Sequence, residues 1–83
     1  MMNWQELIEQ RPEVMLGKPT FKGTRLTVQL VLEHLADGWP EGDLLKAYPR
    51  LRLEHIRAAM AYAAAMLANE ETIFTHEPET VTR

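Results

Sequence analysis

Residues 52–69 read RLEHIRAAMAYAAAMLAN and form the longest stretch of helical periodicity in this chain of 83 residues. Apolar side chains recur there every three or four positions, at Leu53, Ile56, Met60, Ala63 and Leu67. An α-helix rises 1.5 Å per residue, so this face runs for about 25 Å. We therefore expect a helix over residues 52–69 that dominates the fold.

The opposite side of this helix is free of charge where a solvated helix would carry charged residues. It presents Ala58, Ala61, Tyr62, Ala65 and Met66. Small residues let helices approach closely, so this face can pack against the N-terminal segment, through Trp4, Leu7 and Ile8, or against a second subunit. Short chains bury little surface and often gain stability by oligomerising, so we favour the second subunit and expect a homodimer.

Two shorter helices are predicted upstream, over residues 27–37 and 40–48. The first has a favourable N-cap in Thr27 and a stop signal in Gly38, and the second begins with Pro40. The first also carries an apolar stripe at helical spacing, made of Val28, Val31, Leu32 and Leu35. Three helices with short connections predict a mainly α fold, a homeodomain-like trihelical bundle whose last two helices form a helix-turn-helix.

The two ends of the chain have weaker signals. Asn3 followed by Glu6 has the spacing of a capping box, which predicts a short helix over residues 4–9. Residues 14–22 show two short extended pieces joined by turn residues, which predicts a β-hairpin. Residues 70–83 are rich in Thr, Glu and Pro and cannot build a core, so we expect a flexible acidic tail.

Composition limits the classes of protein to consider. The length allows one domain, predicted over residues 1–69. Cysteine is absent and no apolar stretch is long enough to span a bilayer, so we expect a cytoplasmic protein without membrane contact. The net charge is −3, but the acidic residues gather at the two ends and the basic residues gather in the middle.

Basic residues around the predicted helix-turn-helix are candidates for DNA contact: Lys46, Arg50, Arg52, His55 and Arg57. A recognition helix places such side chains near phosphates and base edges. The alternative is a solvated surface with ordinary ion pairs, for example between Glu54 and Arg57. Because the helix turns to alanine soon after Arg57, sequence specificity would require two copies of the chain.

Catalysis and metal binding are not expected. The chain has neither cysteine nor serine to act as a nucleophile, and we find no convincing carboxylate pair. His34, His55 and His76 lack the spacing of a metal site. Residues 17–24 contain two glycines and a lysine but not the Walker spacing. The sequence therefore predicts a binding protein, with no enzyme activity and no cofactor.

Several short runs, in this order, resemble the bacterial domain-of-unknown-function family 433. They are GKPTFKGTRLTV at 17–28, LADG at 35–38, YPRL at 48–51, IRAA at 56–59 and AYA at 61–63. Members of that family look like homeodomain-like helix-turn-helix proteins, and many resemble VapB-type antitoxins encoded beside a PIN-like ribonuclease toxin. The resemblance implies an antitoxin that neutralises such a toxin and binds operator DNA to regulate its own operon.

If the partner is such a toxin, the candidate contacts are Arg25, Ile73, Phe74 and Arg83. Ile73 and Phe74 are apolar anchors in the acidic tail, and the alternative for the tail is a disordered end with no role. For Arg25 an internal role, holding a carboxylate or a backbone carbonyl, is the alternative. For the whole chain the alternative is a protein-binding adaptor that has this fold but does not bind DNA. One departure from the family pattern, Gly42 inside the second helix, costs about 0.5–1 kcal/mol relative to alanine.

Overall fold

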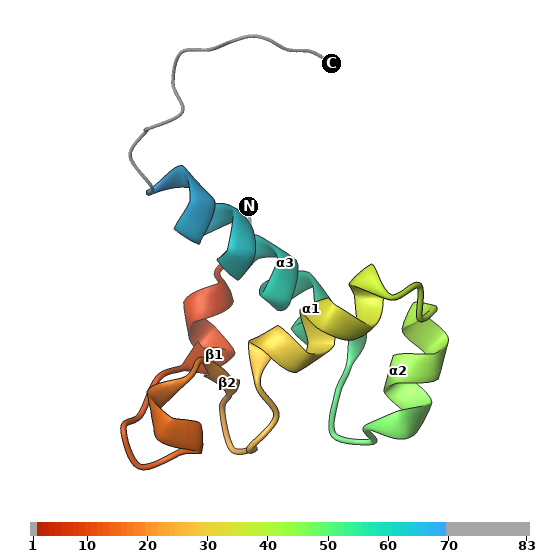
Figure 1. Cartoon of the computed structure of the whole chain (residues 1–83), viewed down its shortest axis with the longest axis horizontal. Helices are drawn as coiled ribbons and strands as arrows, with labels where there is room; N and C mark the ends of the chain where they lie inside the picture. The colour runs from red at the N-terminus through yellow and green to blue at the C-terminus, as the bar shows by residue number, and fades with distance from the viewer. Residues whose placement is uncertain (1, 70–83) are drawn as a thin grey trace, which may run out of the picture.

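The structure is a computed structural model that describes residues 2–69. Within this range the chain is mainly helical, with three α-helices, two 3-10 turns (η) and one two-stranded antiparallel sheet (Figure 1). The elements are η1 Trp4–Glu6, β1 Ile8–Glu9, η2 Met15–Gly17, β2 Thr20–Phe21, α1 Val28–Ala36, α2 Glu41–Ala47 and α3 Leu53–Ala68. The predicted flexible tail, residues 70–83, lies outside the described residues.

The three helices occupy the predicted segments, each shorter by one residue at both ends. The difference arises at the caps, because the predicted ranges include the capping residues that flank each helix. At the start of α1 the Thr27 hydroxyl accepts a hydrogen bond from the Leu30 amide at 3.0 Å. After α1 the chain reverses at Gly38, whose φ is +92°. None of the helices formed by residues 2–69 is both long enough and apolar enough to cross a membrane.

The core forms where the three helices and the sheet meet. Figure 1 shows α3 passing behind α1, with α2 beside one end of α1 and the strands near the other. The helices α1 and α2 both pack against α3 and against each other. The side chains that seal this core are completely buried: Phe21, Val31, Leu44, Ile56, Ala58 and Ala59.

The N-terminal sheet differs from the predicted hairpin. An antiparallel pair is present, but β2 pairs with β1, with Ile8 opposite Phe21 and Glu9 opposite Thr20. The predicted range of 14–22 is therefore wrong in its first strand. The pairing with β1 buries Ile8 and Phe21 together, whereas Leu16 is 94% exposed. The gain from burying two large apolar side chains selects this register over the local hairpin.

The predicted helix over residues 4–9 is also wrong in extent. Only the turn η1 forms, and the Asn3 side chain makes no capping bond to the backbone. The chain then becomes extended, and the Leu7 carbonyl accepts a hydrogen bond from the Lys22 amide at 2.9 Å. A helix continuing through Ile8 would give up this bond and the pairing with β2.

The buried face of α3 differs in part from the prediction, because Ile56 is buried as expected but Leu53, Met60 and Leu67 are exposed. Ala58 is fully buried and Ala61 is 7% exposed within the chain itself, so these two predicted dimer-interface residues are not available to a second subunit. Tyr62 is half-buried, and its ring meets Trp4 edge-on with 4.9 Å between ring centroids. Of the predicted interface, Ala65 is half-buried and Met66 is exposed.

The outward face of α3 carries the larger side chains instead. We call this face the outer stripe, which consists of Leu53, Arg57, Met60, Ala64 and Leu67. In it Leu53 is 38% exposed, Met60 45% and Leu67 67%. Alanines face inward because they let α1 and the N-terminal segment approach the helix axis closely, which longer side chains would prevent.

Two glycine substitutions should shift stability in opposite directions. Gly42 lies in α2 with open space around its Cα, so Gly42→Ala should raise the free energy of unfolding by about 0.5–1 kcal/mol. Gly38 also has open space, but Gly38→Ala should lower that free energy by about 1–2 kcal/mol because its φ is +92°. Urea unfolding followed by circular dichroism measures both changes, and destabilisation by Gly42→Ala would contradict the helical geometry of α2.

Candidate functional site

The motif Lys22-Gly23-Thr24-Arg25 forms a tight turn between β2 and α1. The Thr24 hydroxyl donates a hydrogen bond to the Phe21 carbonyl at 2.8 Å and accepts one from the Leu26 amide at 3.0 Å. Gly23 has a φ of +79°, which residues with a side chain rarely adopt. The turn leaves the Gly23 carbonyl and the Arg25 side chain on its outer side.

Arg50 holds this turn from the other half of the molecule. It lies in the connection between α2 and α3, and its guanidinium donates a hydrogen bond to the Gly23 carbonyl at 2.9 Å. Its neighbour Leu51 is 4% exposed and anchors the connection in the core. The internal role considered for Arg25 therefore belongs to Arg50, since Arg25 makes no recorded hydrogen bond or ion pair within residues 2–69.

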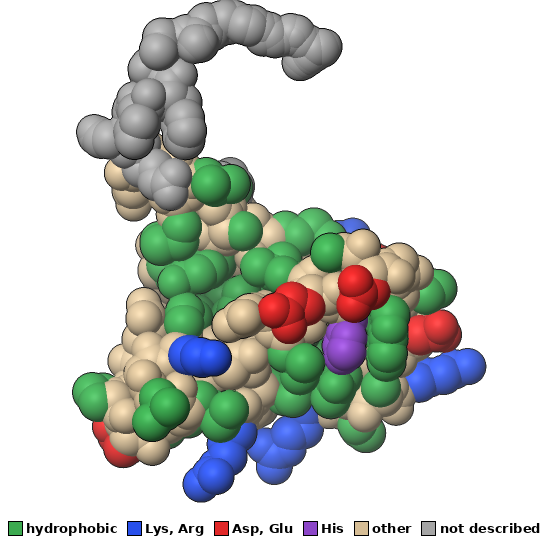
Figure 2. All heavy atoms as spheres, viewed as in Figure 1, with side chains coloured by type: hydrophobic (Ala, Val, Ile, Leu, Met, Phe, Trp, Pro, Cys, Tyr) green, Lys and Arg blue, Asp and Glu red, His purple; other side chains and the backbone are tan. Residues whose placement is uncertain are grey.

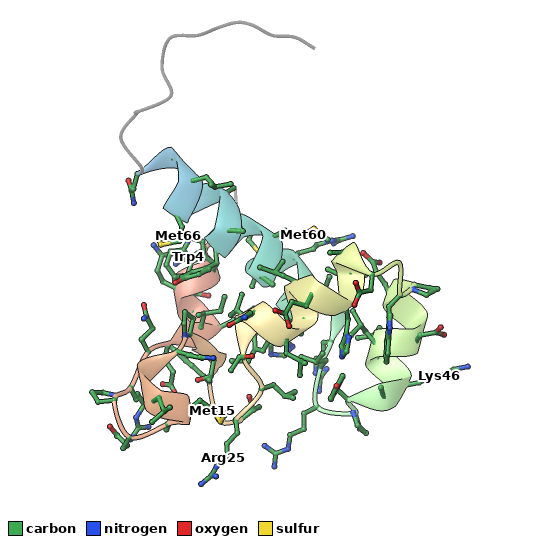
Figure 3. All side chains as sticks on the ribbon, in the orientation of Figure 1. Trp4, Met15, Arg25, Lys46, Met60 and Met66 are labelled. Atoms are coloured by element: carbon green, nitrogen blue, oxygen red, sulfur yellow. The ribbon has the colours of Figure 1, made fainter. Side chains whose placement is uncertain are left out.

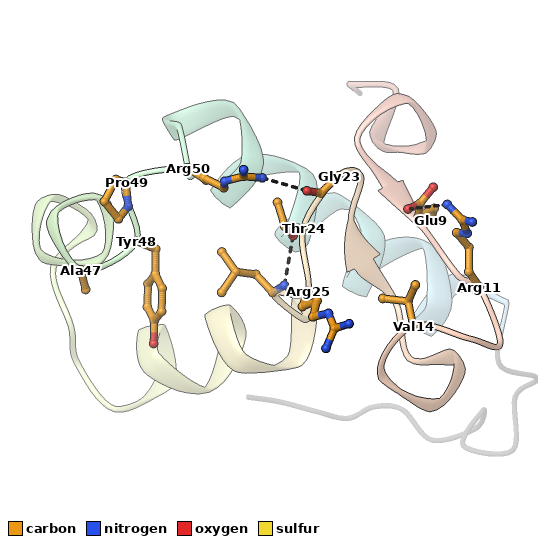
Figure 4. A pocket seen from close by; sticks show the side chains of 11 residues that line it. Glu9, Arg11, Val14, Gly23, Thr24, Arg25, Ala47, Tyr48, Pro49 and Arg50 are labelled. Carbon is orange, nitrogen blue, oxygen red and sulfur yellow. Dashed lines mark hydrogen bonds and ion pairs between the residues drawn. The ribbon is translucent and has the colours of Figure 1, made fainter.

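A groove of about 650 Å³ opens between the turn, β1 and the connection from α2 to α3 (Figure 4). Its apolar lining is Val14, Leu26, Ala47, Tyr48 and Pro49. Its charged lining is Glu9, Arg11, Arg25 and Arg50. In Figure 4 the Arg50–Gly23 bond lies on one side of the groove, and Arg11 with Glu9 lies on the other.

The arginines of the groove differ in how many of their N–H donors already have a partner. Arg11 contacts the Glu13 carboxylate at 2.9 Å and the Glu9 carboxylate at 4.0 Å. A backbone hydrogen bond, and then Arg11, lower the pKa of the Glu13 carboxyl below its usual value. Arg25 and the remaining N–H groups of Arg50 are therefore the donors that face the groove without a recorded partner among the described residues.

The five predicted DNA contacts do not form one cluster. Lys46 is exposed in the last turn of α2, and Arg52 is exposed just before α3. Arg57 belongs to the outer stripe of α3. His55 has a structural role, because its Nδ1 accepts a hydrogen bond from the Arg52 amide at 3.0 Å and its ring meets Phe21 edge-on.

The surface charges remain mostly unpaired. Within residues 2–69 the recorded salt bridges involve Arg11 alone, so the alternative ion pair between Glu54 and Arg57 is not present. Figure 2 shows Lys and Arg side chains projecting along the lower edge of the molecule and at its right side. Figure 3, in the same orientation, labels Arg25 at this lower edge and Lys46 at the right side.

Two features of this region were missed by sequence reasoning. The first is the groove, whose key bond joins residues 27 positions apart. The second is an aromatic cluster in which His34 stacks on Trp39 with centroids 4.1 Å apart and shares a 3.1 Å hydrogen bond with Tyr48. Among residues 2–69 no group of three or more His, Cys, Asp or Glu side chains could hold a metal ion, and His76 lies outside this range.

The geometry thus defines a small, mainly helical domain with an arginine-lined groove beside its second and third helices. The chain belongs to the family described as Protein of unknown function (DUF433), whose model matches residues 8–63. It is similar to the uncharacterized protein y4eO of Sinorhizobium fredii, with 34% identity over 76 residues, which cover 90% of this chain and 34% of that protein. The chain therefore spans about a third of the length of that relative.

The fold is similar to that of a solved member of the same family. The crystal structure of a DUF433 member protein from Anabaena variabilis has a TM-score of 0.72 and 30% sequence identity to this chain. The match covers 77% of this chain and 63% of that one. Family membership and the main fold therefore rest on both sequence and structure.

Substitution of Arg50 tests the bond that holds the groove together. Arg50→Ala removes the hydrogen bond to Gly23 and should lower the free energy of unfolding by about 1 kcal/mol. Lys46→Ala, which removes an exposed cation that makes no ion pair with the other residues of 2–69, should change it by less than about 0.5 kcal/mol. Equal effects of the two substitutions in urea unfolding would show that the bond to Gly23 does not stabilise the fold.

Proposed function

We propose that this chain is a non-catalytic antitoxin that binds operator DNA through a helix-turn-helix and binds and neutralises a PIN-like ribonuclease toxin in the cytoplasm. The fold supports this proposal, since α1, α2 and α3 pack against one another with short connections, as in a homeodomain-like trihelical domain. In this arrangement α2 and α3 are the helix-turn-helix, and α3 is the recognition helix.

The observation that carries DNA binding is the exposure of cations from the last turn of α2, across the connection, to the second turn of α3. Lys46, Arg52 and Arg57 are exposed and have no ion pair within residues 2–69. Cations at the start of a recognition helix bind phosphates, and phosphate contacts supply most of the non-specific affinity for DNA. Arg50 contributes less, because its guanidinium already binds the Gly23 carbonyl.

The toxin contact rests on the family resemblance and on Arg25. Arg25 is exposed at the groove and available to a partner. The other proposed contacts, Ile73, Phe74 and Arg83, lie outside the described residues. Binding of the toxin would then use the groove side and the C-terminal segment of the chain.

One observation favours the second candidate, a protein-binding adaptor without DNA binding. The outer stripe, which a recognition helix would turn toward bases, presents apolar side chains at Leu53, Met60 and Leu67. Apolar side chains contact thymine methyl groups but cannot read the hydrogen-bonding edges of the other bases. The two candidates differ in whether the chain binds DNA and in how that binding depends on salt.

A gel-shift assay with DNA from upstream of the protein's own reading frame tests the DNA contact. If about three phosphates are contacted, the association constant should fall about 40-fold between about 50 and 200 mM salt. The double variant Arg52→Ala with Arg57→Ala should abolish binding. A charge-matched control, Arg11→Ala with Lys18→Ala, should retain it, because both exposed residues belong to the N-terminal segment before β2 and not to the connection between α2 and α3. Equal loss in both variants, or no binding by the wild type, would favour the adaptor.

Specific operator binding requires two copies, and we assign the pairing to Met60 and Leu67 in the C-terminal half of the outer stripe, which leaves Arg52 and Arg57 at the start of α3 to the DNA. Light scattering should therefore give twice the 9.6 kDa mass of one chain. Met60→Glu places a charge in the middle of the stripe and should give the mass of a monomer. Leu16→Glu, at an apolar residue that is more exposed but lies in η2, should leave the dimer intact. A monomeric wild type at every accessible concentration would exclude the homodimer.

A further inference from the structure

The groove combines positive charge with an apolar lining, and of the DNA contacts proposed above only Arg50, already bound to the Gly23 carbonyl, lies in it. We propose that the groove binds an extended acidic segment of a partner protein, in which a carboxylate stands next to a bulky apolar side chain. This inference goes beyond the proposed function, because it names the chemistry of the bound segment and holds whether or not the partner is a toxin.

Arg50 is already oriented for a carboxylate. Its bond to the Gly23 carbonyl fixes the guanidinium beside the groove and uses only part of its five N–H donors. A side chain that is ordered before binding loses less conformational entropy when the ligand arrives. The donors left over have the planar geometry that suits a carboxylate.

Arg25 supplies the second positive charge. It lies two residues from Gly23, on the turn that Arg50 holds, and it is exposed without a recorded partner among the described residues. Figure 4 shows its side chain extending from the turn toward the side of the groove that Val14 lines. The groove is therefore lined by one fixed guanidinium, that of Arg50, and one free guanidinium, that of Arg25.

The rest of the lining indicates what must accompany the carboxylate. Val14, Leu26, Ala47 and Pro49 line the same space as the arginines. A volume of about 650 Å³ has room for several ligand groups. An anion without an apolar part would leave these four side chains in contact with water, so the bound segment needs an apolar residue beside the acidic one.

The same features disfavour a nucleic-acid backbone. The Glu9 carboxylate lies across the groove from Arg50, where a single carboxylate beside the turn avoids it but a chain of phosphates would not, and Arg11 is already engaged by Glu9 and Glu13 (Figure 4). A duplex backbone also has no apolar group for the side of the groove formed by Leu26 and Pro49. Charge and shape therefore favour a single carboxylate over a series of phosphates.

Nuclear magnetic resonance titration of the ¹⁵N-labelled full chain tests this inference. The probe is a capped peptide of sequence Gly-Leu-Glu-Phe-Gly, and the control peptide has Gln in place of Glu. We expect saturable shifts at the amides of Gly23, Thr24 and Leu26 and at the side-chain Nε of Arg25 and Arg50. The Gln peptide should bind at least about tenfold more weakly, because it cannot form the charge-assisted hydrogen bonds.

Variants separate the groove from general charge attraction. Arg25→Gln should weaken binding of the Glu peptide about tenfold, whereas Lys18→Gln, with the same loss of charge on another part of the surface, should leave it unchanged. The proposal is overturned if the peptide causes no saturable shifts, if the Gln peptide binds equally well, or if both variants lose binding alike. It also fails if inorganic phosphate or a DNA duplex displaces the peptide and shifts the same signals more strongly. Loss of DNA binding in the gel-shift assay alone would not affect it.

Discussion

The packing of α1 against the small residues of α3 is the contact on which the other parts of the structure depend. The helices α1 and α2 have nine and seven residues and are too short to be stable alone in water, whereas α3 has sixteen. Val28 and Val31 of α1 and Ala58 and Ala59 of α3 are all buried in the shared core. The alanines bring the two helix axes close, and the remaining elements attach to this pair.

That pair also sets the position of the groove. The turn from Phe21 to Leu26 leads directly into α1, and the connection that carries Arg50 leads directly into α3. The entry points of the two helices are therefore brought together when the helices pack. The helix packing brings the turn and the α2–α3 connection close together, and the Arg50–Gly23 hydrogen bond then joins them. Fold and groove thus have a common physical origin.

The sequence predicts the helices well because their signals are local. The stripe of α1, the Thr27 cap and the stop at Gly38 lie within a few residues of the structure they determine. The pairing of Ile8 with Phe21 depends on burial against residues far along the chain, so local extended character at 14–16 gave the wrong first strand. For α3, the periodicity indicates two apolar faces but does not determine which residues are buried. Burial there depends on how closely α1 and Trp4 approach the axis of α3.

The sequence predicted which kinds of residue line the site better than it predicted what each residue binds. Exposed cations near the start of α3 follow from the sequence pattern, as do Arg25 and the turn glycine. The hydrogen-bond partners of Arg50 and His55 do not follow from the sequence. Arg50 binds a carbonyl 27 residues away and His55 accepts a bond from a backbone amide, and no sequence pattern distinguishes these residues from unbound polar ones.

The Arg50–Gly23 bond closes a ring of chain that contains both α1 and α2. While it is closed, α2 is tethered at its C-terminal side as well as through the short connection from α1. Fraying of α2, the shortest helix and the one that contains Gly42, would release Arg50 and open the ring. Local unfolding of one short helix would thereby dismantle one wall of the groove, while the contact between α1 and α3 could persist. The groove therefore persists only while α2 stays folded.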